Sequence, residues 1–204
     1  SNHAEAYNNM GAALNDNGDF ESAIDSCRQA IRIKPDFAEA YNNMGLTLQN
    51  KGDLEAAVDS YKQALKIKPD YAEAYNNMGA ALKGKGDLEA AIDSFKRAIQ
   101  IKPDFAGAYN NMGAVLKDKG NSEAAINSFK QALTIKLDHA EAHRHLSAIT
   151  KYDKRTLHVV QMESLYRDKN ITEDQRCHIS FALAKACEDL NEFDQSFSYL
   201  QMGN

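Results

Sequence analysis

The sequence predicts an all-α fold, an α-solenoid in which helix hairpins stack side by side. The first observation is the hexapeptide Ala-Tyr-Asn-Asn-Met-Gly, which occurs four times without change at a spacing of 34 residues. A fixed period of that length is typical of stacked repeats. The second is that apolar residues recur at helical spacing within each period. The four copies are Ala6–Gly11, Ala40–Gly45, Ala74–Gly79 and Ala108–Gly113.

The second period illustrates how each repeat is built. Tyr41, Met44 and Leu48 recur at i, i+3 and i+7, which predicts a helix with one apolar face. After it, Gly52 is suited to a left-handed helix end, and Asp53 is suited to capping the start of a second helix. Each period is therefore expected to form a hairpin that buries its apolar faces only by stacking on its neighbours.

Proline and aspartate mark the end of each of the first three hairpins, and Leu137 replaces the proline in the fourth. Pro69 is expected to stop the second helix, and Asp70 to cap the next one. Asp70 with Glu73 matches a capping box. The same pattern is found in Asp36 with Glu39 and in Asp138 with Glu141.

Composition excludes several classes of function. Hydrophobic residues are 43% and charged residues 26% of the 204, as in a folded protein. The formal charge is −5 and the basic residues are dispersed, which argues against nucleic acid as a partner. No apolar run approaches the ~20 residues of a membrane helix, so no membrane partner is expected.

The cysteines indicate a reducing compartment. Cys27, Cys177 and Cys187 are odd in number and show no CxxC spacing, so we expect three reduced thiols and a cytoplasmic protein.

The periodic residues resemble the tetratricopeptide repeat (TPR). Tyr41, Met44 and Gly45 match the aromatic, Leu-like and glycine positions of its first helix. The second helix matches through Ala57, Tyr61, Ala64 and Pro69. The resemblance implies a right-handed superhelix that binds proteins in a concave groove lined by first helices. Residues 1–139 are expected to hold four regular repeats, at 4–37, 38–71, 72–105 and 106–139.

Residues 140–204 depart from the pattern. We expect a degenerate fifth repeat, with His143 for tyrosine and Ser147 for glycine, then an extra helix over Thr156–Arg167. A sixth TPR-like hairpin should follow, starting at a capping box of Thr172 and Gln175. In that hairpin, Phe193 and Phe197 are expected to pack around the buried positions.

This C-terminal part also resembles the repeat region of bacterial proteins in which TPRs precede a sulfotransferase domain. The resemblance lies in the run Ile179–Ala186 and in Glu188-Asp189-Leu190. It implies an accessory domain whose catalytic domain lies outside this sequence, so further residues are expected in the parent protein.

The candidate binding site consists of asparagines in the first helices. Counted from the first alanine of each repeat, positions 2, 5, 6, 9, 12 and 13 face the groove in the family. An asparagine side chain can pair with both the N–H and the C=O of an extended peptide. Position 6 therefore resembles the asparagine ladder of O-linked N-acetylglucosamine transferase. The candidate peptide-binding residues are Asn9, Asn43, Asn77 and Asn111 at position 6, Asn8, Asn42, Asn76 and Asn110 at position 5, and Lys83 and Lys117 at position 12.

An alternative explanation is that position 6 holds asparagine for local hydrogen bonding or through recent duplication. The basic clamp for a C-terminal carboxylate is not expected, because Glu39, Glu73 and asparagines occupy its positions.

No catalytic motif, metal site or cofactor is predicted. His139 and His143 have metal-ligand spacing, but both replace packing aromatics of the repeat, and His145 takes position 6. We therefore expect a non-catalytic scaffold that binds an extended peptide. The alternatives are a structural module that self-associates through its repeat ends and the accessory domain of a sulfotransferase.

Overall fold

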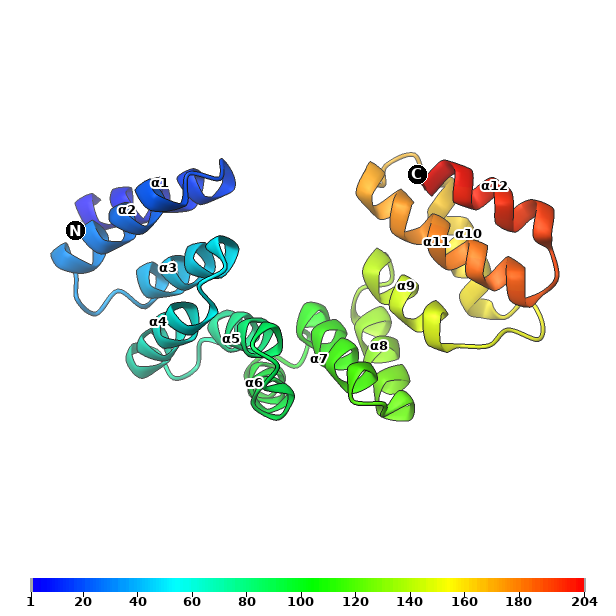
Figure 1. Cartoon of the computed structure of the whole chain (residues 1–204), viewed down its shortest axis with the longest axis horizontal. Helices are drawn as coiled ribbons and strands as arrows, with labels where there is room; N and C mark the ends of the chain where they lie inside the picture. The colour runs from blue at the N-terminus through cyan, green and yellow to red at the C-terminus, as the bar shows by residue number, and fades with distance from the viewer. Residues whose placement is uncertain (1, 204) are drawn as a thin grey trace. The chain divides into compact units, whose positions relative to one another are not determined.

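The computed structural model describes residues 2–203, without the side chain of Met202, and every regular element in that range is a helix. The predicted all-α solenoid of helix hairpins is thus confirmed (Figure 1). The elements are α1 (Asn2–Asp16), α2 (Phe20–Ile33), α3 (Ala38–Lys51), α4 (Leu54–Ile67), α5 (Ala72–Gly84), α6 (Leu88–Ile101), α7 (Ala106–Asp118), α8 (Ser122–Ile135), α9 (Ala140–Ile149), α10 (Leu157–Arg167), α11 (Glu173–Asp189) and α12 (Phe193–Gly203).

Helix packing divides the chain into two units, and the boundary in the sequence lies between Pro103 and Asp104. In the first unit, α1–α6 form three hairpins, and the second helix of one hairpin packs on the first helix of the next. The first helices α1, α3 and α5 also contact one another in order. They therefore form a layer of their own, the first-helix layer, which carries three of the position 6 asparagines.

Each regular hairpin closes around a glycine. A Cβ atom built on Gly45 would lie 2.7 Å from Cε1 of Tyr61, a ring that is fully buried. A Cβ atom built on Gly79 would likewise lie 2.7 Å from Cε1 of Phe95. Because no side chain fits there, the two helices approach closely, as expected of the small residues in the repeat.

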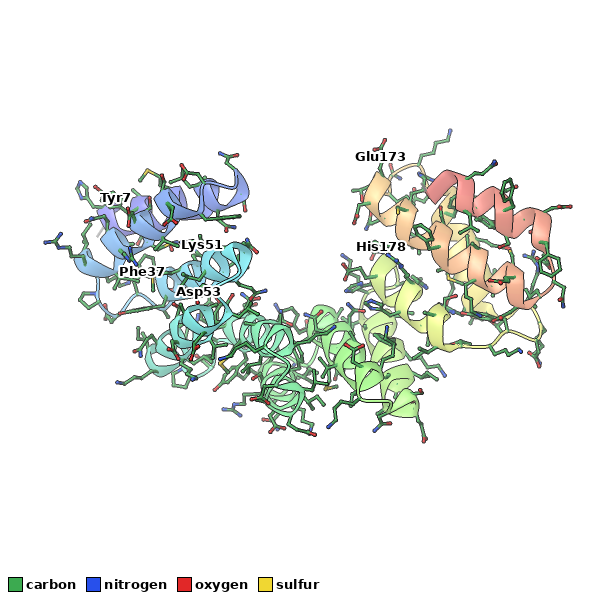
Figure 2. The ribbon with its side chains drawn as sticks, viewed as in Figure 1. Tyr7, Phe37, Lys51, Asp53, Glu173 and His178 are labelled. Atoms are coloured by element: carbon green, nitrogen blue, oxygen red, sulfur yellow. The ribbon has the colours of Figure 1, made fainter. Side chains whose placement is uncertain are left out.

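The turn inside each regular hairpin forms as predicted. Gly52 ends α3 with φ of +93°, and Asp53 accepts a hydrogen bond from the backbone N–H of Ala56 at 3.1 Å. Figure 2 labels Lys51 and Asp53 on either side of this turn. Lys51 also forms an ion pair of 2.6 Å with Glu21.

The predicted capping boxes at the hairpin ends are wrong. The cap of α5 is Tyr71, whose side chain makes no cap bond, and its backbone N–H donates to the Lys68 carbonyl at 3.2 Å. This turn places Asp70 one residue too early to cap. Phe37 and His139 replace Asp36 and Asp138 in the same way.

The second unit pairs α7 with α8 and α11 with α12, and α9 packs against both α8 and α11. α10 packs on α11. One hydrophobic cluster packs α10 and α11 together. Its buried members include Tyr152, Val159, Met162, Ile179 and Leu183. The extra helix and the capping box of Thr172 with Gln175 are both confirmed.

Phe193 and Phe197 are placed differently from the prediction. α12 contacts α11 through Ser196, whose Oγ donates to the Ala184 carbonyl at 2.9 Å. Phe193 and Phe197 lie one turn apart on another face and are each 62% exposed. The expectation that they pack around the buried positions is therefore wrong.

Within residues 2–203, none of the helices is both long enough and apolar enough to cross a membrane.

Candidate functional site

Adjacent asparagines in the same first helix lie at different depths. Asn8 and Asn42, at position 5, are buried, whereas Asn9 at position 6 is exposed and Asn43 is half-buried. Successive residues of a helix point about 100° apart, so one can face the neighbouring helix while the next faces outward. Asn110 at position 5 is also buried, and Asn76, Asn77 and Asn111 are half-buried.

Hydrogen bonds join the two asparagine positions across consecutive repeats. Nδ2 of Asn43 donates to Oδ1 of Asn8 at 2.9 Å, and Nδ2 of Asn77 donates to Oδ1 of Asn42 at 3.2 Å. Each bond runs from position 6 of one repeat to position 5 of the repeat before it. The buried asparagine thereby sets the orientation of the more accessible one.

The second unit repeats this arrangement with a histidine. Nδ1 of His145, at position 6 of the fifth repeat, lies 3.0 Å from Oδ1 of Asn110. Because that oxygen can only accept, the histidine nitrogen donates. Nδ2 of Asn110 in turn donates to Glu141 at 3.2 Å.

One further bond links asparagines near the helix ends. Nδ2 of Asn50 donates to Oδ1 of Asn15 at 2.9 Å. None of these bonds was predicted from the sequence. Except for the bond to Glu141, each joins two polar residues that are 35 positions apart, one more than the period.

The bonds leave chemical capacity at position 6. An asparagine amide has two N–H groups and an oxygen with two lone pairs. Asn43 uses one N–H for Asn8 and retains its Oδ1 and second N–H. Asn77 likewise retains one N–H, and its Oδ1, which accepts from Asn76 at 3.4 Å, retains a lone pair. Both side chains can therefore accept from a peptide N–H and donate to a peptide C=O.

The two lysines of the predicted site lie near the C-terminal ends of their helices, further along the chain than the asparagines. Lys83 lies in the last turn of α5 and Lys117 in the last turn of α7, and both are half-buried.

His143 belongs to the packing of the second unit. It is fully buried, with Nε2 at 2.7 Å from the Leu137 carbonyl and Nδ1 at 2.9 Å from Nε2 of His158. The hydroxyl of Tyr152 lies 2.7 Å from Nδ1 of His158. Both nitrogens of each ring are therefore occupied, which leaves neither ring a nitrogen for a metal.

The directions of these bonds follow from the Leu137 carbonyl, which can only accept a hydrogen bond. His143 must carry its proton on Nε2, so its Nδ1 accepts from Nε2–H of His158. Nδ1 of His158 then accepts from the Tyr152 hydroxyl. Burial lowers the pKa of His143. Burial also lowers the pKa of His158 to about 4, together with the positive charge of Lys130 and the repulsion that a protonated His143 would exert. Both rings are neutral at pH 7.

The cysteines are free thiols. Cys27 and Cys187 are buried, and burial raises the pKa of each to about 11. A thiol with so high a pKa holds little reactive thiolate at neutral pH.

Comparison with protein families identifies the repeats. A TPR repeat model matches residues 11–52, 50–86 and 84–120, and a tetratricopeptide repeat model matches residues 106–139. These matches cover more than half of the chain. The chain therefore belongs to the TPR family.

Solved structures share the fold at low sequence identity. A pilF protein of Pseudomonas aeruginosa is 20% identical with a TM-score of 0.78, and the match covers 98% of this chain and 90% of that one. A thermophilic TPR protein of Thermus thermophilus is 22% identical with a TM-score of 0.65, covering 98% of each chain. MamA of Desulfovibrio magneticus is 21% identical with a TM-score of 0.65, covering 94% and 97%.

A comparison with curated proteins finds no match. The resemblance of the C-terminal part to sulfotransferase-linked repeats stays a prediction. The TPR fold itself is typical of protein-interaction modules.

Proposed function

We propose that this protein is a non-catalytic scaffold whose first-helix layer binds an extended peptide through the position 6 asparagines. The observation that carries the proposal is the orientation of Asn43 and Asn77 by buried asparagines of the preceding repeat. Each keeps one donor and one acceptor, the pair of groups that a peptide unit requires. The site binds the peptide through its backbone, so it tolerates many different side chains on the peptide.

The spacing of the helices suits such a ligand. Packed helices lie roughly 8–10 Å apart, and an extended chain rises about 3.3 Å per residue. One asparagine per repeat therefore meets about every third peptide residue. In the first unit the binding residues are Asn9, Asn43 and Asn77. Asn8 positions Asn43, and Asn42 positions Asn77. Asn111 occupies the same position in the fourth repeat.

Alanine substitution tests the proposal. The variant Asn9→Ala, Asn43→Ala, Asn77→Ala should lose affinity for peptides selected from an array by at least about 30-fold. That loss corresponds to about 2 kcal/mol, which is below the sum of one net hydrogen bond per asparagine. The affinity is measured by fluorescence anisotropy, and circular dichroism verifies the helicity of the variant.

A matched control uses amides on the second helices. Gln29, Gln63 and Gln131 occupy one equivalent repeat position and are exposed. Their triple alanine variant should bind as the wild type does. If the asparagine variant also binds unchanged, the asparagines serve only as contacts between repeats, and the proposal is wrong.

Self-association is the second candidate function, favoured by the exposed phenyl rings of α12. Phe193 and Phe197 form an apolar pair on its surface. If copies associate through this face, the mass measured by analytical ultracentrifugation rises with concentration, and Phe197→Ser keeps the protein monomeric. A mass that stays monomeric at high concentration excludes this candidate.

A further inference from the structure

A groove opens in the second unit where the fifth repeat departs from the regular pattern. α9 has 10 residues, whereas α5 and α7 each have 13. It ends at Thr150, whose backbone is extended. α10, the next helix, packs on α11. Part of the surface of α8 is left without the cover that a regular repeat provides.

The first unit shows what normally covers this surface. Val58 of α4 packs in one cluster with Met78, Ala81 and Leu82 of α5. Ile126 of α8 is the counterpart of Val58, but the counterpart of Leu82 is Thr150, at which α9 ends. Ile126 therefore packs in one cluster with Leu146 and Ile149 of α9 but lacks the apolar residue that Leu82 provides in the first unit.

Two adjoining cavities occupy this place. One of about 390 Å³ is lined by Ile126, Ile149 and Tyr152, and one of about 500 Å³ is lined by Leu133 and Leu157. Lys130, Leu146 and His158 line both cavities, so the two lie side by side, and we refer to them together as the groove. Its volume is in the range of ligand-binding pockets, which are typically 300–1,000 Å³.

The charged residues that line these two cavities are both basic, although a third cavity beside them is lined by Asp138 and Asp168. The charged residues that line it are Lys130 and Lys151, and no carboxylate is among its lining residues. This is notable in a chain of formal charge −5. His158 adds no charge at neutral pH because its pKa lies at about 4.

Lys130 lacks the partner that its counterparts have. Three ion pairs of one geometry occur in the first unit, at Arg28 with Asp25, Lys62 with Asp59, and Lys96 with Asp93. In the fourth repeat the residue three before Lys130 is Asn127. The basic residue that faces the groove is therefore the one whose local aspartate is replaced by a neutral side chain.

We infer from this juxtaposition that the groove binds an acidic peptide, with a large apolar side chain in the cavities and carboxylates on Lys130 and Lys151. The occupant complements both features of the groove, its apolar walls and its positive rim. This site is separate from the asparagines of the first-helix layer and does not depend on them.

The test uses fluorescein-labelled 12-residue peptides that hold leucine, isoleucine, phenylalanine or methionine between glutamates. A second set has glutamine in place of glutamate. The acidic set should bind, and its affinity should fall with ionic strength. Lys130→Glu should weaken binding about tenfold or more, because it removes one favourable charge and adds a repulsive one. Lys62→Glu, at the equivalent position of the second repeat, should leave binding unchanged.

Two further substitutions locate the site. Asn127→Asp restores the local ion pair of Lys130 and should weaken binding about threefold to fivefold by competing for the lysine. Leu157, which lines the groove, is 73% exposed, so Leu157→Glu blocks the groove without loss of a core contact. Val160→Glu, on an exposed residue of the same helix outside the groove, should have no effect.

The outcome is decided by comparing the variants. Weakening by Lys130→Glu and Leu157→Glu, with both controls unchanged, supports the inference. Equal binding of the acidic and glutamine sets, equal effects of Lys130→Glu and Lys62→Glu, or no binding of either set overturns it. The triple asparagine variant should bind the acidic set as the wild type does, so failure of one proposal is distinguishable from failure of the other.

Discussion

At the scale of single residues, identical neighbours in the sequence perform different tasks. Asn42 is buried and accepts a hydrogen bond from the next repeat, while Asn43 beside it donates to the previous repeat and keeps groups for a ligand. The hexapeptide therefore contains both the contact that joins repeats and the candidate binding group. Its glycine performs a third task, the close approach of the two helices.

The glycine contact predicts a specific loss of stability. A Cβ atom at Gly79 would lie 2.7 Å from Cε1 of the fully buried Phe95 ring. Gly79→Ala should lower the free energy of unfolding by about 1–2 kcal/mol, since overpacking costs about 1–3 kcal/mol and alanine regains up to about 1 kcal/mol of helix propensity. Urea unfolding followed by circular dichroism measures the change.

Gly84 provides the control in the same helix. Its added Cβ would meet the tip of the flexible Leu54 side chain. Gly84→Ala should leave stability unchanged within about 0.5 kcal/mol or raise it. Equal losses for the two variants would contradict the packing role assigned to Gly79.

At the scale of elements, the regular hairpins could be predicted and the irregular ones only in part. Gly45 against Tyr61 and the turn at Gly52 follow from local rules that recur in every period. The cap of α5 was assigned to Asp70 instead of Tyr71 because the turn after Lys68 extends one residue further than the capping pattern implies. Predicting the exact cap requires knowing where the proline turn closes.

The candidate site was predicted as residues but not as a network. Bonds such as Asn43 to Asn8 depend on the offset between stacked helices, which the repeat period alone does not specify. The exposed faces of Phe193 and Phe197 were missed for a related reason. Asn191 makes the same left-handed turn as Gly52, so Phe197 falls at the position of Val58, which packs on the first helix of the next hairpin in the first unit. Burial at that position depends on packing beyond its own hairpin, which local rules do not specify.

The histidine network of α9 and α10 predicts a loss of stability in mild acid. His158 has a folded-state pKa of about 4 against an ordinary value of 6.5. The unfolded chain therefore binds more protons between these values, and stability falls as the pH is lowered through this window. The loss from pH 7.5 to pH 5 should be about 2 kcal/mol from His158.

Substitution separates this effect from other titrations. His158→Gln removes the titrating ring and should flatten the pH dependence of the urea midpoint between pH 7.5 and pH 5. The variant is less stable at pH 7.5 because it loses the bond to the Tyr152 hydroxyl. An unchanged slope would contradict the neutral His143–His158 pair.

At the scale of the whole molecule, the chain is a TPR protein with two helical units. The first unit carries three of the four regular repeats with their asparagines, and the second carries the fourth repeat and the groove at the degenerate fifth. Regular repeats place equivalent side chains at a constant spacing. Such a series suits a ligand whose own binding groups are evenly spaced, such as a peptide backbone. Departure from repetition produces a cavity with its own shape and charge.

The most direct test of the central claim is an N-methyl scan of a peptide selected by the wild-type protein. N-methylation removes one backbone N–H at a time and leaves the side chains unchanged. If asparagines at the spacing of the repeats bind the backbone, affinity should fall at about every third position, by roughly fivefold to tenfold at each. A scan without this period, or an array from which no peptide binds, would contradict the account.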